Sequence, residues 1–289
     1  MDDEVEFRPA TEADFAAEHD VFADASGGLL RRHGFETPEP TAEDAERFTR
    51  THTHLLAHDG ERSFVAEVAG AVVGFSDAIV RGDTWFLSML FIRERFQGRG
   101  IGRRLLELSW GEGHARRLTI SSAIQPISNG LYAQRGLVPA TPMLPLAGEP
   151  RIDAPPGLDA VAPEPDAIAT LDRAAYGFDR RVDHAFWSQG ATATLWLRDG
   201  EPAAYSYRSG EGAIGPVAGA DPESAAAALQ AELARGEGPA GVAIPGSARE
   251  LVETALAAGL RFEAPPGLLL LSAGVAQPRS LAIGSYGLL

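Results

Sequence analysis

The fold is decided at residues 91–106, which read FIRERFQGRGIGRRLL. An apolar, β-rich run ends at Ile92, a glycine-dense turn follows at residues 97–102, and an amphipathic helical pattern starts near Gly100. Backbone amides at a helix N-terminus lack partners and attract phosphates, and glycines let an anion approach the backbone closely. Residues 93–104 hold five arginines and one acid, in a chain whose net charge is −15. The stretch therefore predicts a binding turn for a small polyanion; the alternative is a tight strand–helix turn with solvated arginines.

Two common phosphate-binding patterns are excluded. A dinucleotide-binding fingerprint needs G-x-G-x-x-G early in a parallel βαβ unit, but here the turn follows three β-rich runs, at residues 63–68, 72–80 and 84–92. A Walker loop needs a lysine, and all 25 basic residues of this chain are arginines. Neither pattern therefore explains the glycine turn.

A second motif, SNGLYAQRGL at residues 128–137, follows about 30 residues after the glycine turn QGRGIG at residues 97–102. With this order and spacing, the two motifs resemble those of the GCN5-related N-acetyltransferases (GNAT). The first matches the family's Gln/Arg-x-x-Gly-x-Gly/Ala pattern between the fourth strand and the third helix. The resemblance covers residues 5 to about 145, and the rest of the chain is similar to the degenerate second domain of tandem acetyltransferases.

The order of predicted elements supports two similar halves. Helices are expected at residues 10–22, 43–58, 100–115 and 129–135, and the second half repeats helices, a strand meander, then helices alternating with strands. Seven prolines between residues 141 and 165 predict an extended linker or an irregular edge strand. We expect an α+β (three-layer α/β) fold with GNAT-like domains at residues 1–148 and 149–289, each a mixed, mainly antiparallel twisted sheet flanked by helices.

The resemblance implies a role for each residue that matches the motifs. Leu90, Phe91 and Ile92 would lie on the splayed end of the fourth strand, where one backbone amide polarises the thioester carbonyl of acetyl-CoA. Tyr132 would protonate the departing thiolate. The pyrophosphate would be cradled by Gln97, Gly98, Arg99, Gly100, Ile101, Gly102 and Arg103.

Two features depart from the family pattern. Gln125 stands where the family has a motif asparagine, and the only asparagine of this chain, Asn129, either contacts the cofactor or caps the short helix. No carboxylate that would deprotonate the acceptor amine lies in residues 84–92. The candidates nearby are Asp77, Glu67, His33 and Glu36, each more readily interpreted as a solvated or structural group.

The second half lacks the cofactor turn. After its third predicted strand, acids stand at Asp221 and Glu223 and no arginine is present, so the helix N-terminus is expected to be capped from within and to repel pyrophosphate. We therefore expect the second domain to have lost acyl-CoA binding and to shape the acceptor pocket, bury a face of the first domain or mediate homodimerisation. Residues 283–289 are expected to approach the site of the first domain.

Composition narrows the function. The chain has no cysteine, which excludes disulfides and thiolate zinc sites, and its acidity argues against nucleic-acid binding. No apolar run is long enough to span a membrane, so we expect a cytoplasmic, bacterial-type protein. The histidines at positions 52, 54 and 58 are interpreted as a solvated helix face, not a metal site. The resemblance implies an acetyl-CoA-dependent N-acetyltransferase acting on a primary amine of a small molecule or peptide; the alternative is a non-catalytic acyl-CoA-binding or regulatory module.

Overall fold

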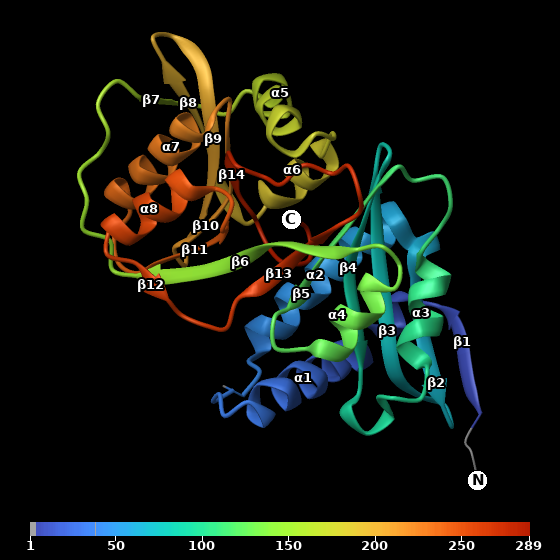
Figure 1. The fold of residues 1–289 in the computed structure, drawn as a ribbon. Coiled ribbons are helices and arrows are strands. Elements are labelled where there is room, and N and C mark those ends of the chain that lie inside the picture. The colour runs from blue at the N-terminus through green and yellow to red at the C-terminus, as the bar shows by residue number, and fades with distance from the viewer. Residues whose placement is uncertain (1–3, 38) are drawn as a thin grey trace. The chain divides into compact units, whose positions relative to one another are not determined.

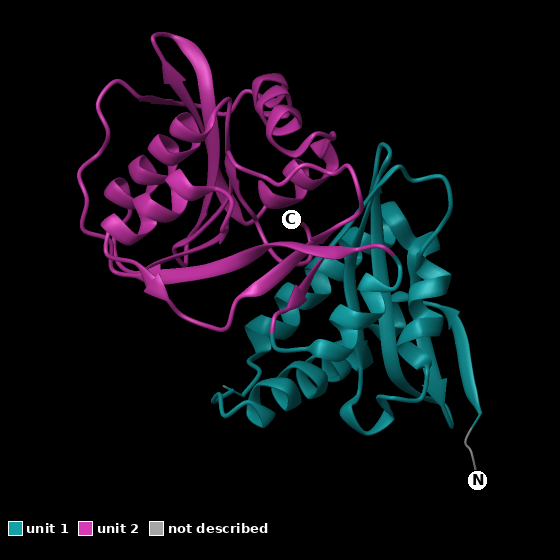
Figure 2. Cartoon of the chain, viewed as in Figure 1, with its two compact units in different colours: residues 1–119, 124–135 teal, residues 120–123, 136–289 magenta. Residues whose placement is uncertain are grey.

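The structure is a computed structural model that describes residues 4–37 and 39–289. Its contacts divide the chain into two compact units (Figure 2). Unit 1 holds the described residues up to Thr119 together with residues 124–135, and unit 2 holds residues 120–123 and 136–289. The predicted division after residue 148 is not tested by this grouping and stays a prediction.

Unit 1 is built on a mixed, mainly antiparallel sheet (Figure 1). Neighbouring strands are antiparallel from β1 to β4, and β4 pairs with β5 in parallel. In spatial order the strands are β1 (Val5–Pro9), β2 (Ser63–Val68), β3 (Ala71–Arg81), β4 (Thr84–Ile92) and β5 (Arg116–Ser122). This arrangement confirms the predicted sheet type for the first half of the chain.

Helices cover both faces of this sheet. Alternate residues of a strand point to opposite faces, and Phe75 packs with α1 and α2 residues while its neighbour Ser76 donates to the Leu105 carbonyl of α3. One face therefore carries α1 and α2, and the other carries α3. The helices of unit 1 are α1 (Phe15–Arg32), α2 (Ala42–Asp59), α3 (Ile101–Ser109) and α4 (Pro126–Ala133), with short 3-10 turns at Glu12–Asp14, Gly60–Arg62 and Glu94–Phe96.

Two of the predicted helices have wrong boundaries. The first helix was expected over residues 10–22, but α1 starts at Phe15 and continues to Arg32 through Gly27 and Gly28, which are both buried. The helix expected over residues 100–115 ends at Ser109. Gly111 and Gly113 follow with φ of +57° and +80°, a left-handed backbone that cannot continue an α-helix.

Unit 2 has its own mixed sheet, in the order β13-β6-β11-β10-β9-β8-β7. From α5 onward, its elements follow the predicted order of helices, a strand meander, and then helices alternating with strands. The strands are β6 (Val138–Gly148), β7 (Asp159–Val161), β8 (Ala191–Arg198), β9 (Glu201–Ser209), β10 (Ala213–Gly219), β11 (Ala240–Pro245), β12 (Arg261–Phe262), β13 (Gly267–Leu271) and β14 (Leu281–Ala282), and the helices are α5 (Pro165–Tyr176), α6 (Arg181–Trp187), α7 (Pro222–Arg235) and α8 (Arg249–Ala257).

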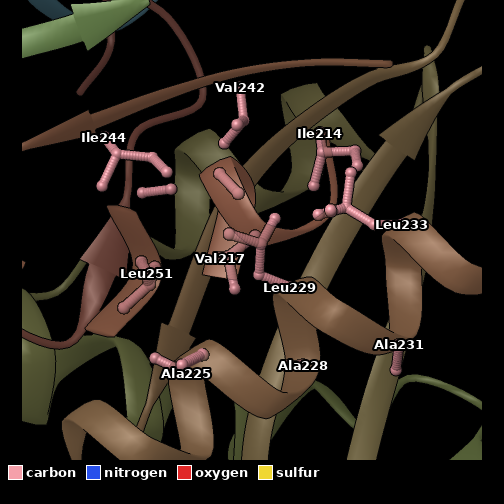
Figure 3. Close-up of a cluster of buried hydrophobic side chains, with 14 of the residues drawn as sticks. Ile214, Val217, Ala225, Ala228, Leu229, Ala231, Leu233, Val242, Ile244 and Leu251 are labelled. Carbon is pink, nitrogen blue, oxygen red and sulfur yellow. The ribbon is translucent and has the colours of Figure 1, made fainter. Parts of the chain in front are cut away.

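The core of unit 2 lies between this sheet and the helix pair α7 and α8. Figure 3 shows Ile214 and Val217 of β10 and Ile244 of β11 pointing toward Leu229 of α7 and Leu251 of α8. All five side chains are almost fully buried. Small alanines on α7, including Ala225 and Ala228, let the helix approach the strands closely.

The proline-rich stretch forms an interior strand where we expected a linker or an edge. β6 lies between β13 and β11, although Pro139, Pro142 and Pro145 cannot donate to a ladder. The sheet accommodates them because their carbonyls still accept: Gly246 N donates to Pro142 O at 2.8 Å, and Glu263 N donates to Pro145 O at 3.2 Å. The linker interpretation fits residues 149–158 and 162–164, which form neither helix nor strand, and the edge-strand interpretation fits β7, the last strand in the order of the sheet.

Among the residues that the structure describes, no helix has the length and apolar character needed to cross a membrane.

Candidate active site

The site in unit 1 is built on a fork between two parallel strands. The β4–β5 ladder runs from Thr84 beside Arg116 to Leu87 beside Thr119. Beyond Leu87, β4 continues to Ile92 alongside β3, and its last four residues are only half-buried. The predicted pantetheine-binding residues Leu90, Phe91 and Ile92 therefore lie on the arm of β4 that extends past its ladder with β5.

The glycine turn follows directly at the end of this arm. Gly98 and Gly100 have φ of +78° and +84°, and Gly100 is the N-cap residue of α3 without a side-chain cap. The first turn of α3 carries no acid, so its amides are not occupied by a carboxylate of their own helix. Gln97 Nε2 donates to Ile92 O at 2.9 Å and ties the turn to the strand end.

The space in front of the turn is open. A Cβ placed on Gly98 or Gly100 would meet no atom of the chain within 4 Å. Backbone amides, a helix N-terminus and free volume are the features that a pyrophosphate needs. The turn therefore fits the phosphate-bearing part of acyl-CoA, as the sequence predicted from the same residues.

The five arginines of this region do not all act as free charges. The guanidinium groups of Arg95 and Arg99 lie 4.8 Å and 5.1 Å from the centre of the Phe96 ring, a cation–π arrangement. Arg93 Nε donates to Val72 O at 3.2 Å. Arg103 is exposed at the start of α3. The sequence predicted the basic character of the turn, but it did not predict which arginines contact an aromatic ring or a backbone carbonyl and which are exposed.

Helix α1 holds the segment before the turn in place, which the sequence analysis missed. Glu94 N donates to Asp24 Oδ2 at 2.8 Å, and the Glu94 carboxylate forms an ion pair with Arg32. A Cβ on Gly28 would lie 2.5 Å from Glu94 Oε2, so a larger residue there would require the Glu94 side chain to move. The signal in the sequence was the pair Gly27-Gly28 inside a helical pattern.

Tyr132 lies on α4 and is 4% exposed. Burial raises the pKa of its phenol above the ordinary value, so the group stays protonated and able to donate at neutral pH. Arg135, just after α4, donates to Glu107 Oε1 on α3 at 2.9 Å. This bond joins the helix of the glycine turn to the helix of Tyr132.

Asn129 lies inside α4 rather than at its start. Its backbone N donates to Gln125 O at 3.2 Å, and Gln125 is the N-cap residue. The alternative that Asn129 caps this helix is therefore wrong, and its contact with the cofactor stays a prediction.

The candidate bases differ in their surroundings. Glu67 Oε1 accepts from Arg8 at 2.5 Å, and His33 and Glu36 are exposed. Asp77 is only 3% exposed and belongs to a buried cluster with Glu18 and His52. No sequence pattern indicated this cluster, and the interpretation of the histidines as a solvated helix face is wrong for His52 and His54, which are 2% and 8% exposed. No group of three or more metal-binding side chains with suitable geometry occurs in residues 4–37 and 39–289.

The corresponding fork of unit 2 is filled by the chain itself. β10 pairs with β11 in parallel only at Ala213 and Ile214, and β14 then lies against β10, with Val217 beside Ala282. On its other side, Ile283 N donates to Ala243 O of β11 at 3.0 Å. Residues 281–283 therefore occupy the place between the diverging strands β10 and β11.

The helix that follows this fork is also capped, as predicted. Asp221 is the N-cap of α7, and its Oδ1 accepts from Ser224 N at 2.6 Å. An internal carboxylate takes the position of an external anion. The tail after residue 283 is anchored in unit 2, where Arg180 Nη1 donates to Leu289 O at 2.8 Å. Its expected approach to the site of unit 1 stays a prediction.

Comparisons with known proteins agree with this geometry. Residues 59–136 match the family model of the acetyltransferase (GNAT) domain. A Pyrococcus horikoshii protein assigned as an acetyltransferase aligns with 99% of this chain and 96% of its own, at 20% identity and a TM-score of 0.76. A GCN5-related N-acetyltransferase from Sphaerobacter thermophilus aligns over 96% of this chain and 98% of its own, at 17% identity and a TM-score of 0.66.

A tandem GNAT protein from the clavulanic acid biosynthesis pathway aligns over 95% of this chain and 100% of its own, at 16% identity and a TM-score of 0.57. No curated protein matches the chain significantly. Residues 59–136 are therefore similar to a GNAT acetyltransferase domain, and the whole chain has the fold of tandem GNAT proteins. This confirms the resemblance and the fold class, and it supports acyl-CoA-dependent acetyl transfer as the general activity.

Proposed function

We propose that this protein is an N-acetyltransferase that transfers the acetyl group of acetyl-CoA to a primary amine of a small molecule or peptide. One observation carries the proposal: unit 1 combines the half-buried arm of β4 past the β4–β5 ladder with an uncapped, glycine-lined helix N-terminus at its end. The thioester supplies the activated acetyl group, and the residues of unit 1 bind and orient it.

Each predicted residue has a task in this proposal. The backbone amides of residues 97–102, assisted by Arg99 and Arg103, hold the pyrophosphate. Leu90, Phe91 and Ile92 present strand-edge groups to the pantetheine, and one of their amides polarises the thioester carbonyl. Tyr132, kept protonated by burial, donates a proton to the leaving thiolate. Asn129 contributes a cofactor contact from α4.

We further propose that one chain binds one acyl-CoA, in unit 1 alone. In unit 2 the strand fork is filled by residues 281–283 and the α7 N-terminus is capped by Asp221. Unit 2 then helps to bind the acceptor or mediates assembly of the protein, for example as a homodimer. The cysteine-free, acidic composition supports a cytoplasmic location.

A non-catalytic acyl-CoA-binding module is the second candidate. It is favoured by Gln125 at the family's asparagine position and by the lack of a carboxylate on β4. Such a module would bind acyl-CoA at the glycine turn but would not transfer the acetyl group, so no CoA would be released.

One assay separates the two functions. Release of CoA thiol is measured with a panel of primary amines, for the wild-type chain and for Tyr132→Phe. The enzyme proposal predicts thiol release matched by acetylated amine, and a lower kcat for Tyr132→Phe with unchanged acetyl-CoA affinity. Tight acetyl-CoA binding without release for any amine would establish the binding module instead.

A further inference from the structure

Three titratable side chains meet beneath the helices of unit 1. They are Glu18 on α1, His52 on α2 and Asp77 on β3, and we call them the acid–imidazole cluster. His52 Nε2 lies 3.4 Å from Asp77 Oδ2 and 3.8 Å from Glu18 Oε2. The side chains of Glu18 and His52 are each 1% exposed, and that of Asp77 is 4% exposed.

The cluster contains polar atoms without partners. Both carboxylate oxygens of Glu18, Nε2 of His52 and Oδ2 of Asp77 make no hydrogen bond. Buried polar atoms are almost always paired, and leaving them unpaired destabilises a fold. The nearest arginine, Arg8, already donates to Asp14 and Glu67. The cluster therefore has unused capacity to bind a proton, and its orphaned atoms face one another.

The hydrogen bonds indicate where such a proton would go. His52 Nδ1 lies 3.0 Å from Phe48 O, so this nitrogen carries the ring hydrogen and Nε2 holds a lone pair in the neutral imidazole. Burial, together with the charges of Asp77 and Asp14, raises the pKa of Glu18 to about 9, so Glu18 is neutral at pH 7. A proton added to His52 Nε2 would convert its contact with Asp77 into a charged hydrogen bond.

The cluster lies one strand from the fork. Asp77 is the cross-strand neighbour of Met89, which belongs to the arm of β4 beyond the ladder with β5. On the same sheet face, Phe75 stacks on Phe91 at 5.7 Å, and Phe48 of α2 packs against Phe75. The glycine turn leads into α3 on the opposite face. The phosphate-binding turn and the cluster thus flank the reactive arm from two sides.

We propose that the acid–imidazole cluster accepts, through water, the proton that the acceptor amine must lose before it attacks. The proposal rests on the N-acetyltransferase function. His52 takes the proton and Asp77 stabilises the resulting imidazolium. Glu18 is neutral, so it adds no second negative charge beside them. None of the three touches the reacting atoms, so they are positioning residues.

The protons and electrons balance. An N–H bond of the ammonium breaks, its electron pair stays on nitrogen, and the proton reaches His52 Nε2. Nitrogen then bonds to the thioester carbon as the carbon–sulfur bond breaks. As the amide forms, Tyr132 donates its phenolic proton to sulfur, and the second amine proton passes through water to the Tyr132 oxygen and restores the phenol. The cluster finally returns its proton to solvent.

The test compares two acceptors that differ in basicity. A simple alkylamine is protonated at pH 7, whereas 2,2,2-trifluoroethylamine is largely neutral and needs no base. For Asp77→Asn and His52→Gln, we expect kcat/KM with the alkylamine to fall at least tenfold and its pH profile to shift to higher pH. With trifluoroethylamine, we expect kcat/KM to stay within about twofold of wild type.

The control is His54→Gln, which changes a buried histidine of the same helix whose ring lies 4.7 Å from that of His58, outside the cluster. It should leave both acceptors unaffected. An equal loss with both acceptors would mean that the cluster is merely structural, and no loss with either would also overturn the inference. Failure of the wild type to acetylate any amine would instead overturn the proposed function itself.

A second measurement needs no turnover. The pKa of Glu18 is higher in the folded protein than in the unfolded chain, so the folded state holds this proton more tightly. Stability from Glu18 is therefore fully present near pH 4.5 and is lost as pH rises toward about 9. Thermal unfolding between pH 5 and 9 should show this decline in the wild type and a flatter profile in Glu18→Gln. Parallel profiles would refute the protonated cluster.

Discussion

Gly100→Ala is the substitution that separates backbone strain from ligand binding. Gly100 has φ of +84°, which an L-residue adopts only at a cost of about 1–2 kcal/mol. Its new methyl group would meet no atom of the chain within 4 Å, so no clash adds to this cost. The free energy of unfolding should fall by about 1–2 kcal/mol, which lowers Tm by a few degrees.

The effect on acetyl-CoA affinity should be larger than the strain alone explains. The methyl group occupies the open space where the pyrophosphate approaches the α3 amides, and it removes at least one hydrogen bond to a charged group. Such a bond contributes about 1.5–3 kcal/mol, so Kd should rise roughly 10- to 150-fold. Isothermal titration calorimetry with acetyl-CoA measures this directly.

Gly70→Ala is the matched control. Gly70 lies in the β2–β3 turn with φ of +76°, and a Cβ there also meets nothing within 4 Å. Its loss of stability should equal that of Gly100→Ala, while its Kd for acetyl-CoA should stay at the wild-type value. Wild-type affinity in Gly100→Ala, or an equal loss of affinity in Gly70→Ala, would refute the assignment of the turn.

Three further predictions concern other parts of the chain. Tyr132→Phe should lower kcat about 100-fold or more, since a general acid contributes that much, with unchanged acetyl-CoA affinity by calorimetry; an unaltered kcat would exclude its role as acid. Arg180→Leu should lower the free energy of unfolding in urea by about 3–5 kcal/mol, because it leaves Asp172, 1% exposed, without its buried partner; a change below 1 kcal/mol would contradict this. Hydrogen bonds from Arg8 lower the pKa of Asp14 to about 2, so stability from this pair is present above pH 4 and lost as pH falls toward 2. Asp14→Asn should remove that part of the acid transition, worth about 1 kcal/mol for a partly exposed pair, and an identical acid profile would speak against it.

Local patterns in the sequence predicted the parts of the site that local chemistry determines. Glycines in a turn favour a backbone with positive φ, and Gly98 and Gly100 both adopt positive φ values. Asp221 before a helical pattern indicates a cap, and it caps α7. These features depend on neighbours within a few residues, so one sequence suffices to find them.

Features made by distant segments escaped the same reasoning. Glu94, far along the chain, contacts α1 through Asp24 and Arg32. The acid–imidazole cluster joins Glu18, His52 and Asp77 from three elements, and none of their local patterns differs from that of an ordinary surface. The two-residue strand β14 is too short to carry any periodicity, yet it fills the fork of unit 2. Only tertiary pairing reveals these contacts.

The central claim is that acyl-CoA binds to the turn of unit 1 and not to unit 2. Hydrogen–deuterium exchange of the full chain, with and without acetyl-CoA, tests it most directly because amides of both helix N-termini are followed in one experiment. We expect slower exchange at residues 97–103 with acetyl-CoA and unchanged exchange at residues 219–225. Protection at residues 219–225, or none at residues 97–103, would contradict it.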